Sequence, residues 1–152
     1  KGSLNREFYM GKPKSIEYQP YPVNFGIIPN TVVPAGIGGS GDPLDIIILG
    51  SPLAQGDVVK VKIIGLIKMS DFGEKNNKIV AVPIKSDLSD FENLLHLKSR
   101  NPLMIEKIKV WFEKYKGENI VKFENFGTPQ DAKKLITIAN KQYKKSGIKP
   151  RS

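Results

Sequence analysis

The sequence has no cysteine and only one histidine, His96, among its 152 residues. It therefore has no disulfide framework and no thiolate nucleophile, and it lacks the histidine and cysteine ligands of a zinc site. His96 stands among leucines, where we expect an ordinary, partly buried side chain. Long apolar runs are missing too, because residues 44–49 lead directly into Gly50, Ser51 and Pro52, whereas a membrane-spanning helix needs roughly 20 apolar residues. We therefore expect neither cysteine catalysis nor a transmembrane helix.

Acidic residues are fewer than basic ones: 15 Asp and Glu against 24 Lys and Arg give a formal net charge of +9. Such a charge attracts polyanions in general, including nucleic acid, acidic lipid surfaces and small phosphorylated molecules. The basic residues near the C-terminus suit a solvated helix face or tail. With 39% hydrophobic and 26% charged residues, the composition is that of a globular protein with one core.

The chain begins at Lys1, with neither a methionine nor an apolar leader. We expect one domain over residues 1–152 whose N-terminal strands are truncated. Because the lack of cysteine fits a reducing compartment, we expect a cytoplasmic protein, with export as the alternative.

Strand patterns come first in the chain and helix patterns follow. Apolar runs of strand length cover residues 44–49, 58–64 and 79–84, and residues 120–123 can add another short strand. Asn101 and Thr128 can each cap a helix whose first residue is proline; the first helix, with Trp111 and Phe112 in the core, ends before Gly117. The second runs to about residue 147. This order predicts a small, mostly antiparallel barrel or sheet with helices outside it.

Residues 36–41 match the pattern Gly-x-Gly-x-x-Gly of dinucleotide-binding turns. That turn requires a helix directly after it, but Asp42-Pro43 and a strand-like run follow here. We interpret the segment as a loop.

Asp42 and Asp45 flank a turn that Pro43 stiffens at the start of an apolar strand. A rigid turn suits metal ligands, and a carboxylate beside an apolar run is costly to desolvate unless a cation compensates it. The ordinary alternative is a turn-forming Asp42 and a capping Asp45.

Three other segments carry polar groups in a recognisable order. Tyr-Pro-Val-Asn-Phe-Gly spans residues 21–26, Asp71 and Lys78 bracket a hairpin loop, and Tyr115-Lys116 ends the first helix. Taken singly, these are ordinary loop, surface, core and helix-end residues. Together with Asp42-Pro43-Leu44-Asp45 they resemble the family I soluble inorganic pyrophosphatases over about residues 21–116.

The resemblance implies a mainly β or α+β fold, a five-stranded OB-like barrel flanked by two C-terminal helices. It implies hydrolysis of pyrophosphate to two phosphates with Mg²⁺, or alternatively Mn²⁺, and a homo-oligomer, usually a hexamer in bacterial members. Asp42 would be the general base and a metal ligand, Asp45 would bridge two metal ions, and Asp71 would bind a further ion. The implied phosphate-binding groups are Tyr21, Lys78, Tyr115 and Lys116, with Tyr21 and Lys78 also serving catalysis.

The chain departs from the family pattern at metal positions. Ser40 and Asn76 stand where the family has aspartates; both still offer oxygen ligands, but the loss of two negative charges predicts weaker divalent binding. Phe25 replaces a tyrosine. Arg6 stands in place of a phosphate-binding lysine, with Phe8 for an acidic residue, and Lys12 or Lys14 could serve for the family arginine. We therefore expect reduced or altered activity.

Two alternatives belong to other classes. A small basic barrel could bind single-stranded nucleic acid, but the aspartates would place negative charge in the groove. The other alternative is a catalytically impaired homologue that binds a phosphorylated ligand.

Overall fold

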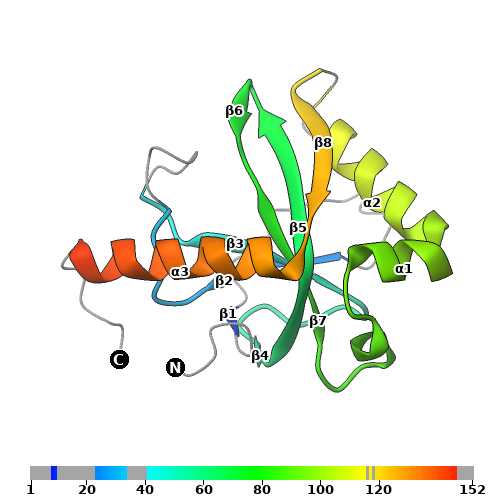
Figure 1. The fold of residues 1–152 in the computed structure, drawn as a ribbon, viewed down its shortest axis with the longest axis horizontal. Coiled ribbons are helices and arrows are strands. Elements are labelled where there is room, and N and C mark those ends of the chain that lie inside the picture. Colours follow the sequence, from blue (N-terminus) through cyan, green and yellow to red (C-terminus); the bar gives the residue numbers. More distant parts are fainter. Residues whose placement is uncertain (1–7, 10–22, 34–40, 116, 118, 147–152) are drawn as a thin grey trace.

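The computed structural model of the chain describes residues 8–9, 23–33, 41–115, 117 and 119–146. These residues contain eight strands and three α-helices (Figure 1). In chain order they are β1 (Phe8–Tyr9), β2 (Val23–Ile28), β3 (Leu44–Leu49), β4 (Val58–Val59), β5 (Val61–Asp71), β6 (Glu74–Lys75), β7 (Lys78–Pro83), α1 (Leu94–Arg100), α2 (Pro102–Lys114), β8 (Val121–Gly127) and α3 (Pro129–Lys145).

The strand order closes the sheet into a barrel. Neighbouring strands follow the order β4, β1, β2, β3, β7, β5 and β6, and β8 pairs with the other side of β5. β4 pairs with β1 at one end of the series β1, β2, β3, β7, and β5 pairs with β7 at the other end. Only Lys60 separates β4 from β5, so one continuous segment joins the two ends of the series. β3 and β7 are parallel, and the other pairs are antiparallel. The predicted OB-like barrel with α+β character is confirmed.

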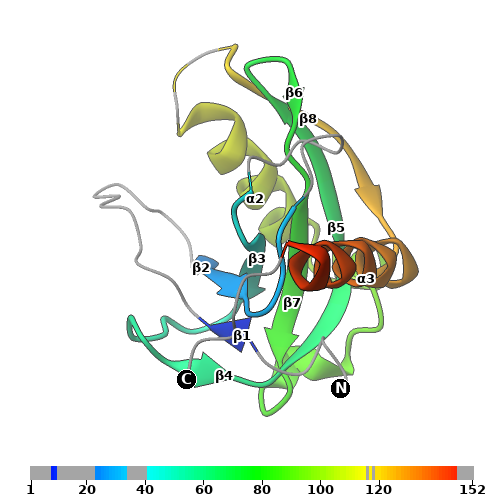
Figure 2. The same ribbon diagram turned by 90° about the vertical axis from the view of Figure 1, so that its left-hand side faces the viewer.

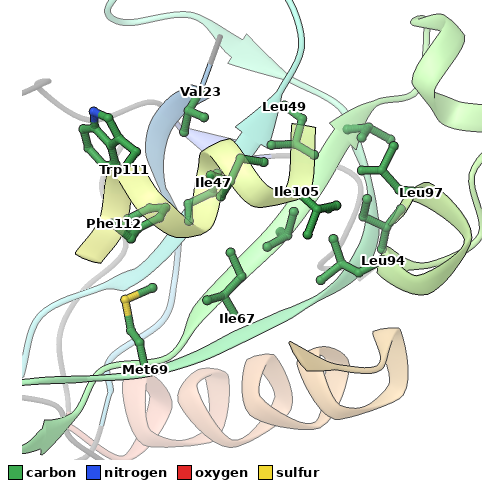
Figure 3. Close-up of a cluster of buried hydrophobic side chains, with 14 of the residues drawn as sticks. Val23, Ile47, Leu49, Ile67, Met69, Leu94, Leu97, Ile105, Trp111 and Phe112 are labelled. Atoms are coloured by element: carbon green, nitrogen blue, oxygen red, sulfur yellow. The ribbon is translucent and has the colours of Figure 1, made fainter. Parts of the chain in front are cut away.

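Side chains on the two faces of the sheet enter two different apolar clusters. One face meets α1 and α2 and includes Ile47, Met69 and Val80, which belong to the same apolar cluster as Trp111 and Phe112 of α2. Figure 3 shows part of this cluster. The other face meets α3 and is aliphatic throughout. Figure 1 shows α3 and α2 on opposite sides of β5, and in Figure 2 α3 crosses in front of this strand. We call the first surface the α2 face and the second the α3 face.

The predicted helix starts hold, because the Asn101 side chain accepts a hydrogen bond from the N–H of Met104 and Thr128 accepts one from Asp131. Helix α1, which the sequence pattern did not predict, has only seven residues, and Leu94 and Leu97 alone are buried. Two apolar positions give too little periodicity to identify a helix. The strand predicted over residues 120–123 runs instead as β8, from Val121 to Gly127.

Candidate functional site

Asp45 and Lys78 meet where two parallel strands begin. Ile46 of β3 pairs with Ile79 of β7, so the residue that precedes each is also a neighbour. Because side chains alternate along a strand, Asp45 and Lys78 project from the same side as Ile47 and Val80, on the α2 face. The Lys78 ammonium lies 2.5 Å from Oδ2 of Asp45, and this ion pair anchors the site.

Burial of the pair corrects one expectation. The Lys78 side chain is 11% exposed, but that of Asp45 is 51% exposed, so the neighbouring apolar strand does not desolvate the carboxylate. Asp45 lies at the rim, where its strand has only begun. Lys78 compensates its charge, and the open carboxylate can accept a further cation or donor from solvent.

Asp71 is the last residue of β5, which runs antiparallel to β7, and it also projects from the α2 face. A bulge between Ile63 and Gly65 shifts the alternation of β5, so that Ile67, Met69 and Asp71 face α2. Lys78 pairs with Ile67, four residues before Asp71 on β5. The loop between Asp71 and Lys78 folds back over β5, since the N–H of Asn76 donates to the carbonyl of Met69 over 2.9 Å. The predicted bracketing of the hairpin loop by Asp71 and Lys78 is confirmed.

Asn76 reaches Asp71 directly. Its Nδ2 donates to Oδ2 of Asp71 over 3.3 Å, which is the geometry of an amide that supports a carboxylate. An aspartate at position 76 would offer no such donor and would repel Asp71 instead. The substitution therefore exchanges a second negative charge for a hydrogen bond that orients the first.

Tyr115 caps α2 and brings a phenol to this end of the sheet. It packs against the apolar cluster that contains Met69 and Val121, the latter paired with Asp71 across β5 and β8. Its ring stacks on that of Trp111, with centroids 4.7 Å apart and planes 12° apart. The helix end is thus fixed beside the strand end that carries Asp71.

The turn that carries Asp42 is held by a residue that the sequence reading missed. The Thr31 hydroxyl accepts from the N–H of Leu44 over 2.9 Å and donates to the carbonyl of Ile28 over 2.6 Å. The N–H of Val33 also donates to the Asp42 carbonyl over 2.9 Å. The side chain of Asp42 is exposed, so a stiff turn presents this carboxylate to solvent. A lone threonine after a strand gives no recognisable signal.

Asn24, in the Tyr-Pro-Val-Asn-Phe-Gly segment, has a structural task. Its side chain is buried and bonds the carbonyls of Ile48 and Ser51 and the N–H of Leu53. It thereby fastens the loop after β3. Phe25, next along β2, points to the α2 face, with its ring centroid 5.4 Å from that of Trp111.

The donor chemistry of the described site fits Mg²⁺. Carboxylate oxygens are its preferred protein ligands, and it is commonly held by one or two carboxylates plus waters and substrate phosphates. Asp45 and Asp71 supply such oxygens on one face. Within the described part of the chain, no three histidine or acidic side chains form a group that could hold a metal ion. A cation here would depend on water and substrate for the rest of its ligands.

Four of the predicted site residues, Arg6, Tyr21, Ser40 and Lys116, lie outside the described residues, as do Lys12 and Lys14.

The structure describes the residues for which an ordinary structural place was expected. His96 is half-buried, and its Nδ1 accepts from the N–H of Glu92, as an ordinary structural histidine does. Trp111 and Phe112 are core residues. No helix in the described ranges has the length and apolarity to cross a membrane.

Comparison with known proteins gives a consistent answer. The family model described as inorganic pyrophosphatase matches residues 8–144. The inorganic pyrophosphatase of Xanthomonas axonopodis pv. citri is 33% identical over 127 residues, which cover 81% of this chain and 68% of that protein. That of Nanoarchaeum equitans is 36% identical over 132 residues, covering 82% of this chain and 78% of the other.

Solved structures agree in fold. The inorganic pyrophosphatase structure from Helicobacter pylori has a TM-score of 0.73 and 26% identity, and the match covers 93% of this chain and 91% of that one. The structure from Thermus thermophilus also has a TM-score of 0.73, with 25% identity, over 94% of this chain and 86% of the other.

Proposed function

The chain belongs to the inorganic pyrophosphatase family, and from this membership and the geometry of its site we propose that it hydrolyses pyrophosphate to two phosphates with Mg²⁺ as cofactor. The observation that carries the proposal is the Asp45–Lys78 ion pair on the α2 face, the face on which Asp71 and Tyr115 also lie. A small, densely anionic substrate requires both positive donors and carboxylates for a metal at one place.

Asp42 is proposed as the general base. Its exposed carboxylate, held by a stiff turn, accepts a proton from the attacking water. The water oxygen bonds to one phosphorus, the bond from that phosphorus to the bridging oxygen breaks, and the second phosphate leaves with the electron pair. Bound Mg²⁺ would supply charge neutralisation and a more acidic water, with Asp45 and Asp71 as ligands. Mn²⁺ is the alternative ion.

Lys78 and Tyr115 are proposed to bind phosphate oxygens. The Lys78 ammonium is mostly buried and already directed to the site by Asp45, so little side-chain freedom is lost when an oxygen binds it. The Tyr115 phenol can donate to another oxygen, and its ring is fixed by Trp111. Arg6, Tyr21 and Lys116 are proposed as further phosphate contacts, and Ser40 and Asn76 as metal-site residues.

The two missing aspartates predict weak metal binding. The amide of Asn76 orients Asp71 but adds no charge, and Mg²⁺ affinity rises with the number of charged ligands. We expect Asn76→Asp and Ser40→Asp each to lower the Mg²⁺ concentration for half-maximal activity about tenfold, and the double variant to lower it further.

The experiment measures phosphate release from pyrophosphate at increasing Mg²⁺ and Mn²⁺ for the native chain, both single variants and the double variant. Activity in the native chain that is strengthened by the aspartates supports the proposal. If all four proteins are inactive, calorimetry with pyrophosphate and metal separates two outcomes. Binding without turnover favours a non-catalytic phosphate binder, and no binding contradicts the proposal altogether.

Two properties of the assembled protein are also proposals. Exposed apolar side chains on α1 and α2, Leu95, Leu103 and Val110, suit a homo-oligomer, six-membered by the resemblance. Light scattering that gives a monomer mass at micromolar concentration would contradict it. We propose a cytoplasmic location, in keeping with the lack of cysteine; fractionation of cells that express the chain tests it.

A further inference from the structure

The proposed chemistry gives Trp111 no contact with the substrate. It is the chain's single tryptophan, lies on α2 and is 6% exposed. Its ring stacks on Tyr115 on one side and tilts against Phe25, with centroids 5.4 Å apart. The side chain is therefore held between a proposed phosphate ligand and the strand β2, with little freedom to turn.

The indole nitrogen of Trp111 is buried without an acceptor. Within the described residues, no hydrogen-bond partner lies near Nε1, although the atom is shielded from solvent. Figure 3 shows the nitrogen at the outer end of the ring, away from the other labelled side chains. A buried donor without an acceptor costs free energy, so such donors normally meet an oxygen from protein, water or ligand.

The neighbouring groups narrow the choice of acceptor. In the aromatic cluster of Phe25, Trp111, Phe112 and Tyr115, the only side-chain polar atoms are the indole nitrogen and the Tyr115 phenol oxygen. The two rings are nearly parallel and one helical turn apart, so the indole and the phenol are direct neighbours. A phosphate oxygen is a stronger acceptor than water because it is charged.

We propose that Nε1–H of Trp111 donates a hydrogen bond to an oxygen of the phosphate group that Tyr115 binds, which makes Trp111 a substrate-binding residue. The inference rests on the proposed function, because it needs a phosphate in the site. Trp111 then has two tasks: its ring fixes the orientation of Tyr115, and its N–H supplies a second donor. Phe25, the ring on the other side of Trp111, has no hydroxyl and cannot donate a hydrogen bond.

A single tryptophan permits a direct spectroscopic test. The ¹H–¹⁵N spectrum of the full chain contains one indole signal, which needs no assignment by mutation. Inorganic phosphate is added in the presence of Mg²⁺, with sodium chloride at equal ionic strength as control. We expect the indole proton to move downfield and to saturate at the same phosphate concentration as the backbone amides of Asp45 and Lys78. Chloride leaves it in place.

Two results would overturn the inference in different ways. If the amides of Asp45 and Lys78 move while the indole signal stays, phosphate binds at the site and Trp111 is only structural. If no signal moves, the site does not take phosphate and the proposed function fails together with the inference.

The variant Trp111→Phe distinguishes the contribution of the indole N–H from that of the aromatic ring. It keeps an aromatic face against Tyr115 and removes the N–H, so we expect KM for pyrophosphate and the dissociation constant of phosphate to rise about tenfold, as for a lost bond to a charged group. Phe112→Leu is the matched control, since it removes packing from the same cluster and no donor. It should lower the melting temperature more than Trp111→Phe and change phosphate affinity less. Equal affinity of Trp111→Phe and the native chain contradicts the inference.

Discussion

The two faces of the barrel sheet carry different kinds of side chain. The α3 face is aliphatic, and small residues of the helix, Ala132 and Ala139, let α3 lie close to the strands. The α2 face contains the aromatic side chains of the core and ends in charged groups, Asp45, Lys78 and Asp71. One face is specialised for packing, and the other combines packing with the site.

The difference has a geometric cause. Strand ends expose polar groups that strand centres cannot, and the C-terminal end of α2 meets the sheet where β3 and β7 begin and β5 ends. Aromatic rings such as Trp111 are large, rigid and partly polar, so they can both fill space and orient a phenol. Substitutions in the aromatic cluster of the α2 face should therefore change both stability and substrate binding, whereas those on the α3 face should change stability alone.

The largest expected effect is that of Phe112→Ala. Phe112 is fully buried, and its ring lies edge-on to that of Tyr115 at 5.9 Å. We expect the free energy of unfolding to fall by about 3–5 kcal/mol and KM for pyrophosphate to rise. Ile136→Ala is the counterpart on the α3 face, with a loss of about 2–5 kcal/mol and an unchanged KM. Urea denaturation and phosphate-release kinetics measure both; a raised KM in Ile136→Ala would break the comparison.

Gly65→Ala tests how closely α1 approaches the sheet. An added Cβ would lie 2.6 Å from Cδ1 of Leu94 and 2.9 Å from the carbonyl oxygen of Gly127, so the helix or β8 has to shift. We expect a loss of about 1–3 kcal/mol in the free energy of unfolding. Gly65→Ala should cost less in a Leu94→Ala background, where the shorter side chain leaves room for the added methyl group. If Gly65→Ala costs as much in that background as in the native chain, the contact with Leu94 is not the cause.

Phe72→Asn should stabilise the hairpin next to Asp71. Phe72 and Gly73 form its two-residue turn with φ angles of 54° and 82°, and the Phe72 side chain is 74% exposed. Such a turn favours Asn-Gly, whereas a bulky residue at positive φ is strained. We expect a gain of about 0.5–1 kcal/mol, measured by thermal and urea unfolding. A loss of stability would indicate that the Phe72 ring packs against the protein.

The smallest expected effect concerns the start of α3. The Thr128 backbone N–H donates to the Asp131 carboxylate, and this bond, with the Thr128 hydroxyl, lowers the pKa of Asp131. A carboxyl whose pKa is lower in the folded than in the unfolded state stabilises above its unfolded pKa, about 3.9, and loses this as pH falls through the folded value. The stability difference between the native chain and Asp131→Asn should therefore shrink below about pH 4. A difference that is constant from pH 3 to 7 in urea unfolding contradicts this.

The sequence predicted the parts of the fold that local chemistry determines. Residues 44–49 form β3 because a continuous apolar run suits a buried strand, and Pro102 and Pro129 begin α2 and α3 after capping residues. The bulge at Gly65 and the meeting of β4 with β1 depend on residues far apart in the chain, and no local pattern reveals them.

The sequence predicted which polar side chains share one face better than it predicted their geometry. Ordered motifs identified Asp45, Asp71, Lys78 and Tyr115, and the structure gathers them on the α2 face. The expected desolvation of Asp45 was wrong, because the sequence cannot tell that its strand begins at an open rim. The contribution of Thr31 was missed, since it depends on a hydrogen bond across 13 residues of chain.

The most direct test compares two lysines on the α2 face at opposite ends of the sheet. Lys78 pairs with Asp45 in the site, and Lys62 lies 3.5 Å from Glu92 outside it. Initial rates of phosphate release from pyrophosphate at saturating Mg²⁺ are measured for Lys78→Met and Lys62→Met. We predict that kcat/KM falls about 100-fold in the first and stays near the native value in the second. Equal rates in the two variants would contradict the assignment of the site.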